Sequence, residues 1–519
     1  MKKKIALLLC LSMLLSVLTG CGRDDKAYVP TGNALVMEDQ EVLPTEPPAP
    51  QQLTMAYYSE KSMNPLQATD YTNRALFSLM YQGLFFVSSN YEAVPILCNR
   101  YQVNSTNKTY TFYLDNATFS DGTPVTVEDV LATYQAAKES KFYSGRFTYV
   151  HSITPSDDGG ICFALTTPYQ DFPLLLDIPI LKASEIESEL PLGSGPYTLE
   201  KGLSGTHLRR NMDWWCKDSH DLSISAESIS LIEGNNPSYI RDQFEFYDVG
   251  LVCANPCAAT YADYRCDYEL WDCDTGIMLY LGFNITYSQD GIFEDPDLRN
   301  AITYAIDRND INQKYYNGQA KVTTIPAEPG SPYHSPSLAA KYEYDSMRFI
   351  QILSHTSIPR KALRLLVNSD DSNRLSVANY IAALLTDYGL PTEVLACNSK
   401  RFQETLVRAD YDLYLGQTKL PANMDLSEFF RPYGNLSRNG ISDAALLSRC
   451  HDALANKGNY SNLHQQIMDE GRICPILFHQ YAIYATRGLV RHLDPSRDAV
   501  FFYSLGKTLA DIQQEIEYG

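Results

Sequence analysis

The sequence predicts a mixed α/β protein built as two or three lobes. The chain has 519 residues, well past the size at which a single hydrophobic core stops growing. Hydrophobic residues make up 45% of it and charged residues 20%, which excludes a fully disordered chain and a membrane protein of many spans. Segments of helical periodicity alternate with short strand-like runs, and this alternation is typical of α/β lobes.

The net charge disfavours a nucleic-acid partner. Asp and Glu outnumber Lys and Arg by 62 to 42, which gives a formal charge of -20. Such a field repels polyanions, and after the first few residues no run of basic residues compensates for it locally. The 37 tyrosines suit either a binding surface or ordinary packing in sheets.

The N-terminal 20 residues indicate a signal peptide. Residues 2–4 are lysines, and residues 5–17 form an apolar stretch that is too short to span a bilayer comfortably. The following residues, 18–21, read Leu-Thr-Gly-Cys, which resembles the lipobox of bacterial lipoproteins. We expect Cys21 to be lipidated and to hold the chain on the outer face of the cytoplasmic membrane. A plain secretory signal is the alternative.

Residues 21–52 are predicted to form a disordered tether. The segment is polar, acidic and rich in proline, with four prolines between positions 44 and 50. It cannot bury enough apolar surface to fold. Its reach is on the order of 30 Å. A lipid, a tether of this length and a large folded body together fit a capture protein held at a membrane surface.

The first part of the folded chain predicts two strands and two helices. Residues 53–58 and 109–114 are expected as strands, and residues 71–84 as a helix. Thr126 and Asp129 stand three residues apart, as in a capping box, and predict the start of another helix.

The second part predicts further helices and strands in alternation. Asp295 is expected to cap a helix that has Pro296 at its first position and runs towards Gly318. The remaining elements are expected at residues 373–388 (helix), 392–396 (strand), 402–407 (helix) and 411–415 (strand). The sequence shows no internal repeat.

The cysteines do not match a structural zinc site. The densest group is Cys253, Cys257, Cys266 and Cys273, and its spacings lack the paired C-x2-C pattern. Export would permit disulfides. We interpret these residues as disulfides or isolated buried thiols and keep metal binding as the alternative. The pairing does not follow from the sequence.

Local motifs for catalysis and cofactors are missing. The sequence has no H-E-x-x-H, G-x-S-x-G, Walker A loop or G-x-G-x-x-G after a strand. No two of the nine histidines lie within five residues of each other, so local His–His metal ligation is unsupported. We therefore expect no cofactor, no metal and no enzymatic activity.

Eight short motifs occur in the order of one known family. The chain resembles extracellular solute-binding protein family 5, the oligopeptide-, dipeptide- and nickel-type substrate-binding lipoproteins of ABC importers. The resemblance covers roughly residues 53 to 519. It is carried by residues 63–66 (MNPL), 81–84 (YQGL), 109–114 (TYTFYL), 119–125 (FSDGTPV), 193–197 (GSGPY), 210–215 (RNMDWW), 281–284 (LGFN) and 297–308 (DLRNAITYAIDR).

The resemblance implies a two-lobed periplasmic-binding-protein-like fold of type II, similar to cluster C, with an extra inserted domain. Lobe I would comprise residues 53–74, 190–283 and 481–519, the inserted domain residues 75–189, and lobe III residues 284–480. The lobes would close about a hinge on a peptide or similar small solute and deliver it to membrane permease subunits. The resemblance also implies an extracytoplasmic protein, which we expect to be a monomer.

The family also implies where a solute would bind. In oligopeptide binders a Trp and then an Asp follow the strand that corresponds to residues 411–415, and the Asp pairs with the peptide's ammonium group. Here Gln417 stands at the Trp position, and Leu420 stands near the Asp position. Asp425 or Asp70 would then have to supply the carboxylate. The predicted ligand-binding residues are Thr69, Asp70, Tyr71, Gln417, Leu420 and Asp425.

Two other functions remain as alternatives. A receptor on the same scaffold would pass on a peptide signal rather than a nutrient. A surface hydrolase would turn over a peptide or a glycan, although the sequence carries no local motif for it.

Overall fold

The computed structural model describes residues 53–203, 205–217, 226–255, 264–490, 493–497 and 499. The predicted signal peptide, Cys21 and the predicted tether lie outside these residues. No helix among the described residues is both long and apolar enough to cross a membrane.

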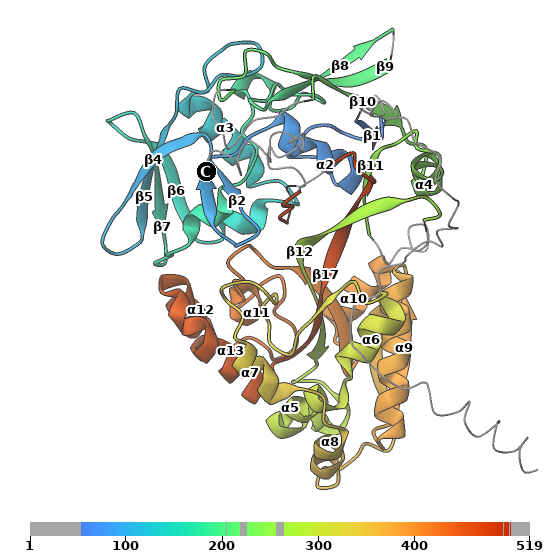
Figure 1. Ribbon diagram of the computed structural model, residues 1–519. Helices are drawn as coiled ribbons and strands as arrows, with labels where there is room; N and C mark the ends of the chain where they lie inside the picture. The colour runs from blue at the N-terminus through green and yellow to red at the C-terminus, as the bar shows by residue number, and fades with distance from the viewer. Residues whose placement is uncertain are drawn as a thin grey trace, which may run out of the picture. The chain divides into compact units, whose positions relative to one another are not determined.

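A mixed sheet of eleven strands organises the described chain, and it confirms the predicted α/β class (Figure 1). Its order is β15-β14-β16-β12-β17-β11-β1-β10-β9-β8, and β13 pairs with β17 at one side of this path. The strands are β1 (Thr54–Tyr57), β8 (Tyr197–Gly202), β9 (Gly205–Arg210), β10 (Ser228–Glu233), β11 (Leu251–Ala254), β12 (Tyr268–Phe283), β13 (Lys321–Val322), β14 (Leu363–Asn368), β15 (Thr392–Cys397), β16 (Leu413–Lys419) and β17 (Ile473–Thr486).

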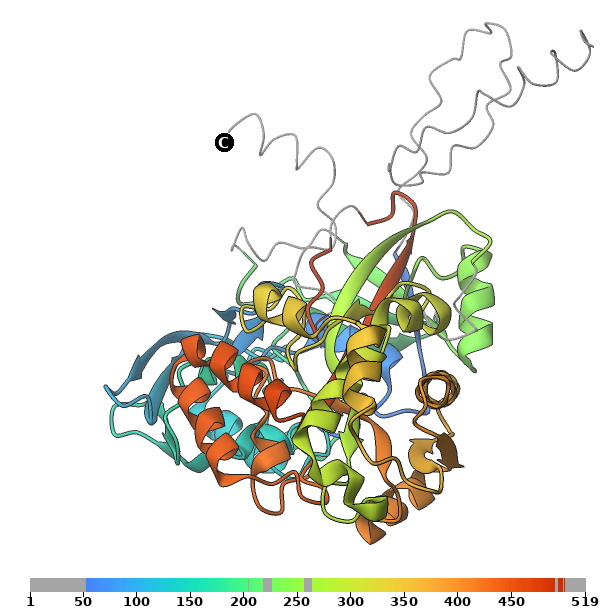
Figure 2. The same cartoon turned by 90° about the horizontal axis from the view of Figure 1, so that it is seen from below.

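Strands β12 and β17 are long and antiparallel, and they join the two halves of this sheet. Both views show them side by side (Figures 1 and 2). The first part of β12 and the last part of β17 pair with each other beside β11 and β1, whereas the opposite ends pair beside β16. The strands therefore run from one half of the sheet into the other.

The β12–β17 ladder is interrupted where the two halves meet. Asp274 pairs with Gln480 and the next pair is Met278 with Phe478, so three residues of β12 face one residue of β17. A surplus of residues on one strand forms a bulge, which bends the strand. We call residues 275–277 the β12 bulge.

Hydrogen bonds of the Thr275 side chain and of the Gly276 backbone replace part of the missing ladder at the β12 bulge. The Thr275 hydroxyl donates to the His479 carbonyl oxygen at 2.6 Å and accepts from the Ile277 amide at 3.0 Å. The Gly276 carbonyl accepts from the Leu420 amide at 2.9 Å. These bonds attach the segment after β16 to the bulge.

The first half of the chain adds two small sheets and several helices to the β1 side. The small sheets are β2 (Phe85–Val87) with β3 (Ala93–Pro95), and β4 (Cys98–Val103), β5 (Thr109–Leu114), β7 (Ile161–Leu165) and β6 (Val150–Pro155) in this spatial order. The helices are α2 (Tyr71–Met80), α3 (Val127–Ala137), η1 (Ser144–Phe147), η2 (Phe172–Leu175), η3 (Ala183–Glu185) and α4 (Pro237–Glu245). One apolar core joins β1 and β11 to β5 and β7 through buried residues such as Met55, Leu251, Phe112 and Phe163.

The second half of the chain surrounds β14, β15 and β16 with helices. They are η5 (Gln289–Glu294), α5 (Pro296–Ala305), α6 (Arg308–Tyr315), α7 (Pro336–Ala339), η6 (Ala340–Tyr342), α8 (Ser346–Leu353), α9 (Ser372–Asp387), α10 (Ser399–Arg408), α11 (Ser427–Phe430), α12 (Ala444–Ala455), η7 (Lys457–Asn459) and α13 (Tyr460–Asp469). A second core lies between α5, α9 and the sheet. A third core packs α11, α12 and α13 against Val87, Tyr91 and Leu174 of the first half, so apolar contacts cross from one half to the other.

Most of the predicted elements are confirmed, and the cap residues explain their starts. Thr126 and Asp129 form the predicted capping box of α3. Residues 109–114 form β5, and helices and strands occupy the four later predicted segments as α9, β15, α10 and β16.

Two predicted helices are wrong in extent. The helix expected over residues 71–84 ends at Met80, because Gly83 packs closely against the backbone of Asp177 and Ile178 and the chain must turn there. The helix expected from Asp295 to Gly318 is two helices, α5 and α6.

The break between α5 and α6 has an evident cause. The backbone is extended at Ile306, and the Asp307 side chain accepts from the Asp310 amide at 3.0 Å, which caps a new helix. The buried Arg308 donates to the carbonyl oxygens of Thr303 and Ile306 at 3.0 and 3.2 Å. These bonds satisfy acceptors that the end of α5 leaves open.

The described cysteines are thiols. Nine of them lie within the described residues, and none of these nine is paired in a disulfide there. Cys257 lies outside the described residues. Among the described residues, no group of three or more His, Cys, Asp or Glu side chains is placed to hold a metal ion.

We expect Gly276→Ala to destabilise the fold more than Gly122→Ala. Both glycines have positive φ, +70° and +82°, where an alanine costs roughly 1–2 kcal/mol. Only at Gly276 would the added Cβ overlap the guanidinium of Arg497, whereas no atom lies within 4 Å of it at Gly122. The overlap adds about 1–3 kcal/mol of overpacking.

Urea unfolding at one temperature measures both free energies. Equal losses in the two variants would mean that the Arg497 guanidinium does not lie against the bulge.

Candidate functional site

The candidate site is a cavity of about 490 Å³ beside the β12 bulge. Its walls come from segments that are distant in the chain, namely residues 141–148, 174–177, 418–425, 428–436 and Arg497. The first two segments belong to the first half of the fold, and the next two belong to the second half. The size lies within the roughly 300–1,000 Å³ of pockets that enclose small organic ligands.

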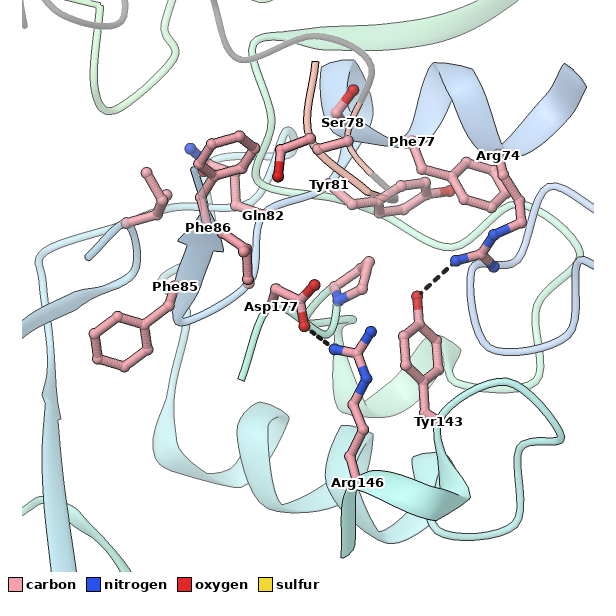
Figure 3. Close-up of a pocket in the computed structure, with 16 residues that line it drawn as sticks. Arg74, Phe77, Ser78, Tyr81, Gln82, Phe85, Phe86, Tyr143, Arg146 and Asp177 are labelled. Atoms are coloured by element: carbon pink, nitrogen blue, oxygen red, sulfur yellow. Dashed lines mark hydrogen bonds and ion pairs between the residues drawn. The ribbon is translucent and has the colours of Figure 1, made fainter. Parts of the chain in front are cut away.

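One wall is built around η1. Arg146 forms an ion pair with Asp177 and donates to the Leu175 carbonyl oxygen at 3.3 Å. The Arg74 guanidinium lies 3.5 Å from the centroid of the Phe142 ring and donates to the Tyr143 hydroxyl at 3.0 Å. Both arginines also line a smaller cavity of about 70 Å³, and Figure 3 shows the side chains around it. Arg146 and Asp177 line both cavities.

The opposite wall follows the end of β16. The Lys419 ammonium lies 4.9 Å from the centroid of the Phe142 ring, so a cation–π contact joins the two walls. Leu420 is buried, and its amide is held by the bulge. The loop then brings Asp425 to the cavity.

Asp425 is a half-buried carboxylate that is already hydrogen-bonded. One of its oxygens accepts from the Ser427 amide at 2.9 Å, and the other accepts from the Ser427 hydroxyl at 2.7 Å. Burial raises the pKa of Asp425 to about 6, although the two bonds from Ser427 act in the opposite direction, and the nearby Glu428 adds to the increase.

The third wall is Arg497, which lies after β17. One of its terminal nitrogens donates to the Leu420 carbonyl oxygen, and the other lies 3.8 Å from the Glu328 carboxylate. The Arg497 side chain is only 5% exposed.

Polar contacts link the two halves around the cavity. The Tyr91 hydroxyl donates to Glu328 at 2.6 Å, and the Tyr333 hydroxyl donates to Asp171 at 2.8 Å. The Gln170 amide donates to the Leu454 carbonyl oxygen at 2.7 Å. These hydrogen bonds join the two halves of the fold around the cavity.

The six predicted ligand-binding residues do not lie together. Leu420 and Asp425 line the cavity. Asp70 and Tyr71 line a separate pocket of about 340 Å³, where Asp70 caps α2 and pairs with Lys61 at 2.6 Å. Thr69 is exposed.

Gln417 lies on β16 opposite Leu279 of β12 and lines neither of these pockets. It is half-buried, and its side-chain oxygen has no hydrogen-bond partner among the described residues.

The sequence prediction missed Phe142, Arg146, Glu328 and Arg497. None of these four residues lies in a motif that carries the family resemblance. They meet at the cavity through contacts between distant segments of the chain. Arg497 follows Asp494-Pro495-Ser496, a turn-like run that gives no local sign of a buried cation.

We expect Asp425→Asn to change how stability depends on pH. The pKa of Asp425 is raised in the folded protein, so the unfolded chain releases this proton at a lower pH. The contribution of Asp425 to the free energy of unfolding therefore falls as pH rises from about 4 to about 6. The variant lacks this loss. Its stability relative to the original chain should increase by about 2 kcal/mol between pH 4 and pH 7.

Asp387→Asn provides the control, because Asp387 is exposed at the end of α9. Urea unfolding across this pH range measures the difference, and a constant offset for Asp425→Asn would contradict the raised pKa.

Comparison with known proteins identifies the family. The model of the bacterial extracellular solute-binding proteins, family 5, matches residues 92–440. The chain is 22% identical over 365 residues to the glutathione-binding protein GsiB of Escherichia coli K12, covering 65% of this chain and 68% of that protein.

Solved structures show the same fold. One is the ABC transporter substrate-binding protein CtaP of Listeria monocytogenes, at a TM-score of 0.70 and 18% identity, covering 87% of this chain and 97% of that one. Another is the oligopeptide-binding protein AppA of Bacillus subtilis in complex with a nonapeptide, at a TM-score of 0.63 and 19% identity, covering 88% and 100%. The fold is the predicted two-lobed, periplasmic-binding-protein-like one. The chain belongs to the bacterial extracellular solute-binding proteins, family 5.

Proposed function

We propose that the chain is the substrate-binding lipoprotein of an ABC importer, which captures a peptide or a similar small solute and delivers it to a membrane permease. The observation that carries this proposal is the cavity whose walls come from both halves of the fold, beside the bulge in the two strands that join them. A solute in such a cavity contacts both halves at once. Its binding free energy would therefore favour the closed arrangement.

The hinge in this proposal is the β12 bulge with the facing part of β17. Bulged strands bend more readily than regular ones, and hinges are a few residues that absorb backbone rotation. The lobes proposed from the family are residues 53–74, 190–283 and 481–519 for lobe I and residues 284–480 for lobe III. A hinge at the bulge would move residues 278–283, which pair with β16, to lobe III. Residues 75–189 would form the insert, which moves with lobe I because the two share one apolar core.

The charges around the cavity favour a solute that carries both signs. Positive and negative side chains both line it, and a peptide has an ammonium and a carboxylate group that could pair with them. The positive residues are Lys141, Arg146, Lys419 and Arg497, and the negative residues are Asp177, Asp425 and Glu428. The names of two similar proteins, a glutathione-binding and an oligopeptide-binding protein, agree with this class.

The predicted ligand-binding residues have unequal support within this proposal. Leu420 and Asp425 are the best supported, because they line the cavity between the halves. Asp70 and Tyr71 would contact a solute only if it extended into the pocket beside α2, where Tyr71 packs on Tyr481 with ring centroids 4.0 Å apart. Thr69 and Gln417 have no contact that supports a role.

Closure on a solute would make the chain more stable and more compact. A cognate peptide should raise the melting temperature and, in a chain that opens without solute, lower the radius of gyration. A peptide library and a panel of metal chelates, screened by thermal shift, would find the solute, and small-angle scattering would then measure compaction. Tight binding without compaction would rule out closure of an open form.

Anchoring through a lipid on Cys21 can be tested by removing its thiol. Cys21→Ser should release the chain from membranes without changing its melting temperature, because the lipid would be the attachment and residue 21 lies in the predicted tether. Fractionation of cells followed by immunoblotting measures it. A Ser variant that stays with the membrane as fully as the original chain would mean that another element anchors it.

A further inference from the structure

Glu328 is a buried carboxylate with an incomplete set of partners. The residue has no accessible surface. One oxygen accepts from the Tyr91 hydroxyl at 2.6 Å, and the other has no hydrogen-bond partner within the described part of the chain. Burial raises the pKa of Glu328, and the nearby Asp274 adds to the increase. The charged form of such a buried carboxyl group is costly unless a cation lies beside it.

Arg497 provides that cation but fits the position imperfectly. Its Nη1 lies 3.8 Å from the Glu328 carboxylate, which is beyond hydrogen-bond distance, and no other described residue accepts a hydrogen bond from it. Its Nη2 donates to the Leu420 carbonyl oxygen. The guanidinium lies against Gly276, where the lack of a side chain makes room for it.

The neighbouring charges leave a place for one cation. Asp274 is already paired with Lys321 at 2.5 Å and accepts from Gln480 at 2.9 Å. Without Arg497, the two carboxylates would face one lysine only. Glu328 would then be the group without a counter-charge.

The described part of the segment that carries Arg497 is attached to its surroundings mainly by side-chain bonds, and the Cys273 thiol donates to the Arg497 carbonyl oxygen at 3.7 Å. It lies outside the central sheet, and the Ser496 hydroxyl donates to the Ser88 carbonyl oxygen at 3.0 Å. A bridge joins Ser496 to Ala499. Gly276 and Leu420, in contrast, belong to the bulge and to the loop fixed on it. Gly276 and Leu420 are thus fixed by backbone bonds to each other, whereas Arg497 reaches them by its side chain.

We propose that Glu328, the Leu420 carbonyl group and the open face of Gly276 form a cation subsite of the cavity, that Arg497 fills it in the absence of solute, and that an ammonium or guanidinium group of the solute takes its place. The proposal rests on the function proposed above. Asp70 and Asp425 are weaker candidates for this role, because both oxygens of each already accept local hydrogen bonds.

The first experiment tests the subsite without any peptide. Arg497→Ala leaves a space of the size of a guanidinium, so methylguanidinium should raise the melting temperature of this variant saturably, by a few degrees at a concentration well above its dissociation constant. The original chain should show no saturable shift. Arg487→Ala is the matched control, because Arg487 is an exposed arginine paired with Asp267 near the end of β17.

Two further variants protect this test from a folding defect. The double variant Arg497→Ala, Glu328→Gln removes both charges and should fold but show no methylguanidinium shift. Arg497→Gln serves if the alanine variant is unstable. A shift of equal size with and without Glu328, or no saturable shift in either single variant at position 497, would overturn the proposal.

The second experiment tests competition with a solute. If Arg497 fills the subsite about nine-tenths of the time, its replacement by Ala should tighten trilysine binding about tenfold. Triglutamate with an acetylated amino terminus carries no cation and should not gain. Calorimetry with the original chain and with both single Arg variants measures this, and an equal gain for both peptides would overturn the competition.

The two proposals can fail separately. If neither peptide binds to any variant, peptide capture by this cavity is contradicted, while the methylguanidinium result still decides whether the subsite exists. If peptides bind and trilysine gains nothing from loss of Arg497, peptide capture stands and the displacement of Arg497 is wrong.

Discussion

The interrupted pairing of β12 with β17 is the constraint on which the rest of the structure depends. These strands belong to both halves of the large sheet, so any bend in them moves one half against the other. The bulge also provides the carbonyl group that holds Leu420 and the open face on which Arg497 lies. One local irregularity thus sets the proposed hinge, the end of β16 and one wall of the cavity.

Local rules were enough to predict most of the secondary structure. The capping box at Thr126 and the cap at Asp295 need only the residues within one turn, and both are confirmed. The prediction failed where a second signal competed nearby. Asp307 caps a new helix, and the helical periodicity across it gave no warning.

The cavity could be predicted only in part, because its walls come together across long stretches of sequence. Leu420 and Asp425 were found since the loop after β16 is placed by the family's order of motifs. Glu328 and Arg497 are 169 positions apart, and each is unremarkable in its own segment. Their meeting depends on the bulge and on Tyr91 from a third segment, which no local pattern contains.

The unmet hydrogen bonds of Glu328 and Arg497 connect this geometry to the energetics of closure. A buried polar atom without a hydrogen-bond partner costs about 1–3 kcal/mol, and among the described residues Glu328 and Arg497 each have one such atom. A switch from 1% to 99% closed needs about 5.5 kcal/mol of differential binding. A solute cation that bonded fully to Glu328 would remove much of this cost in the closed form alone. In the proposed mechanism, the imperfect fit between Glu328 and Arg497 therefore lets a solute cation bias the hinge.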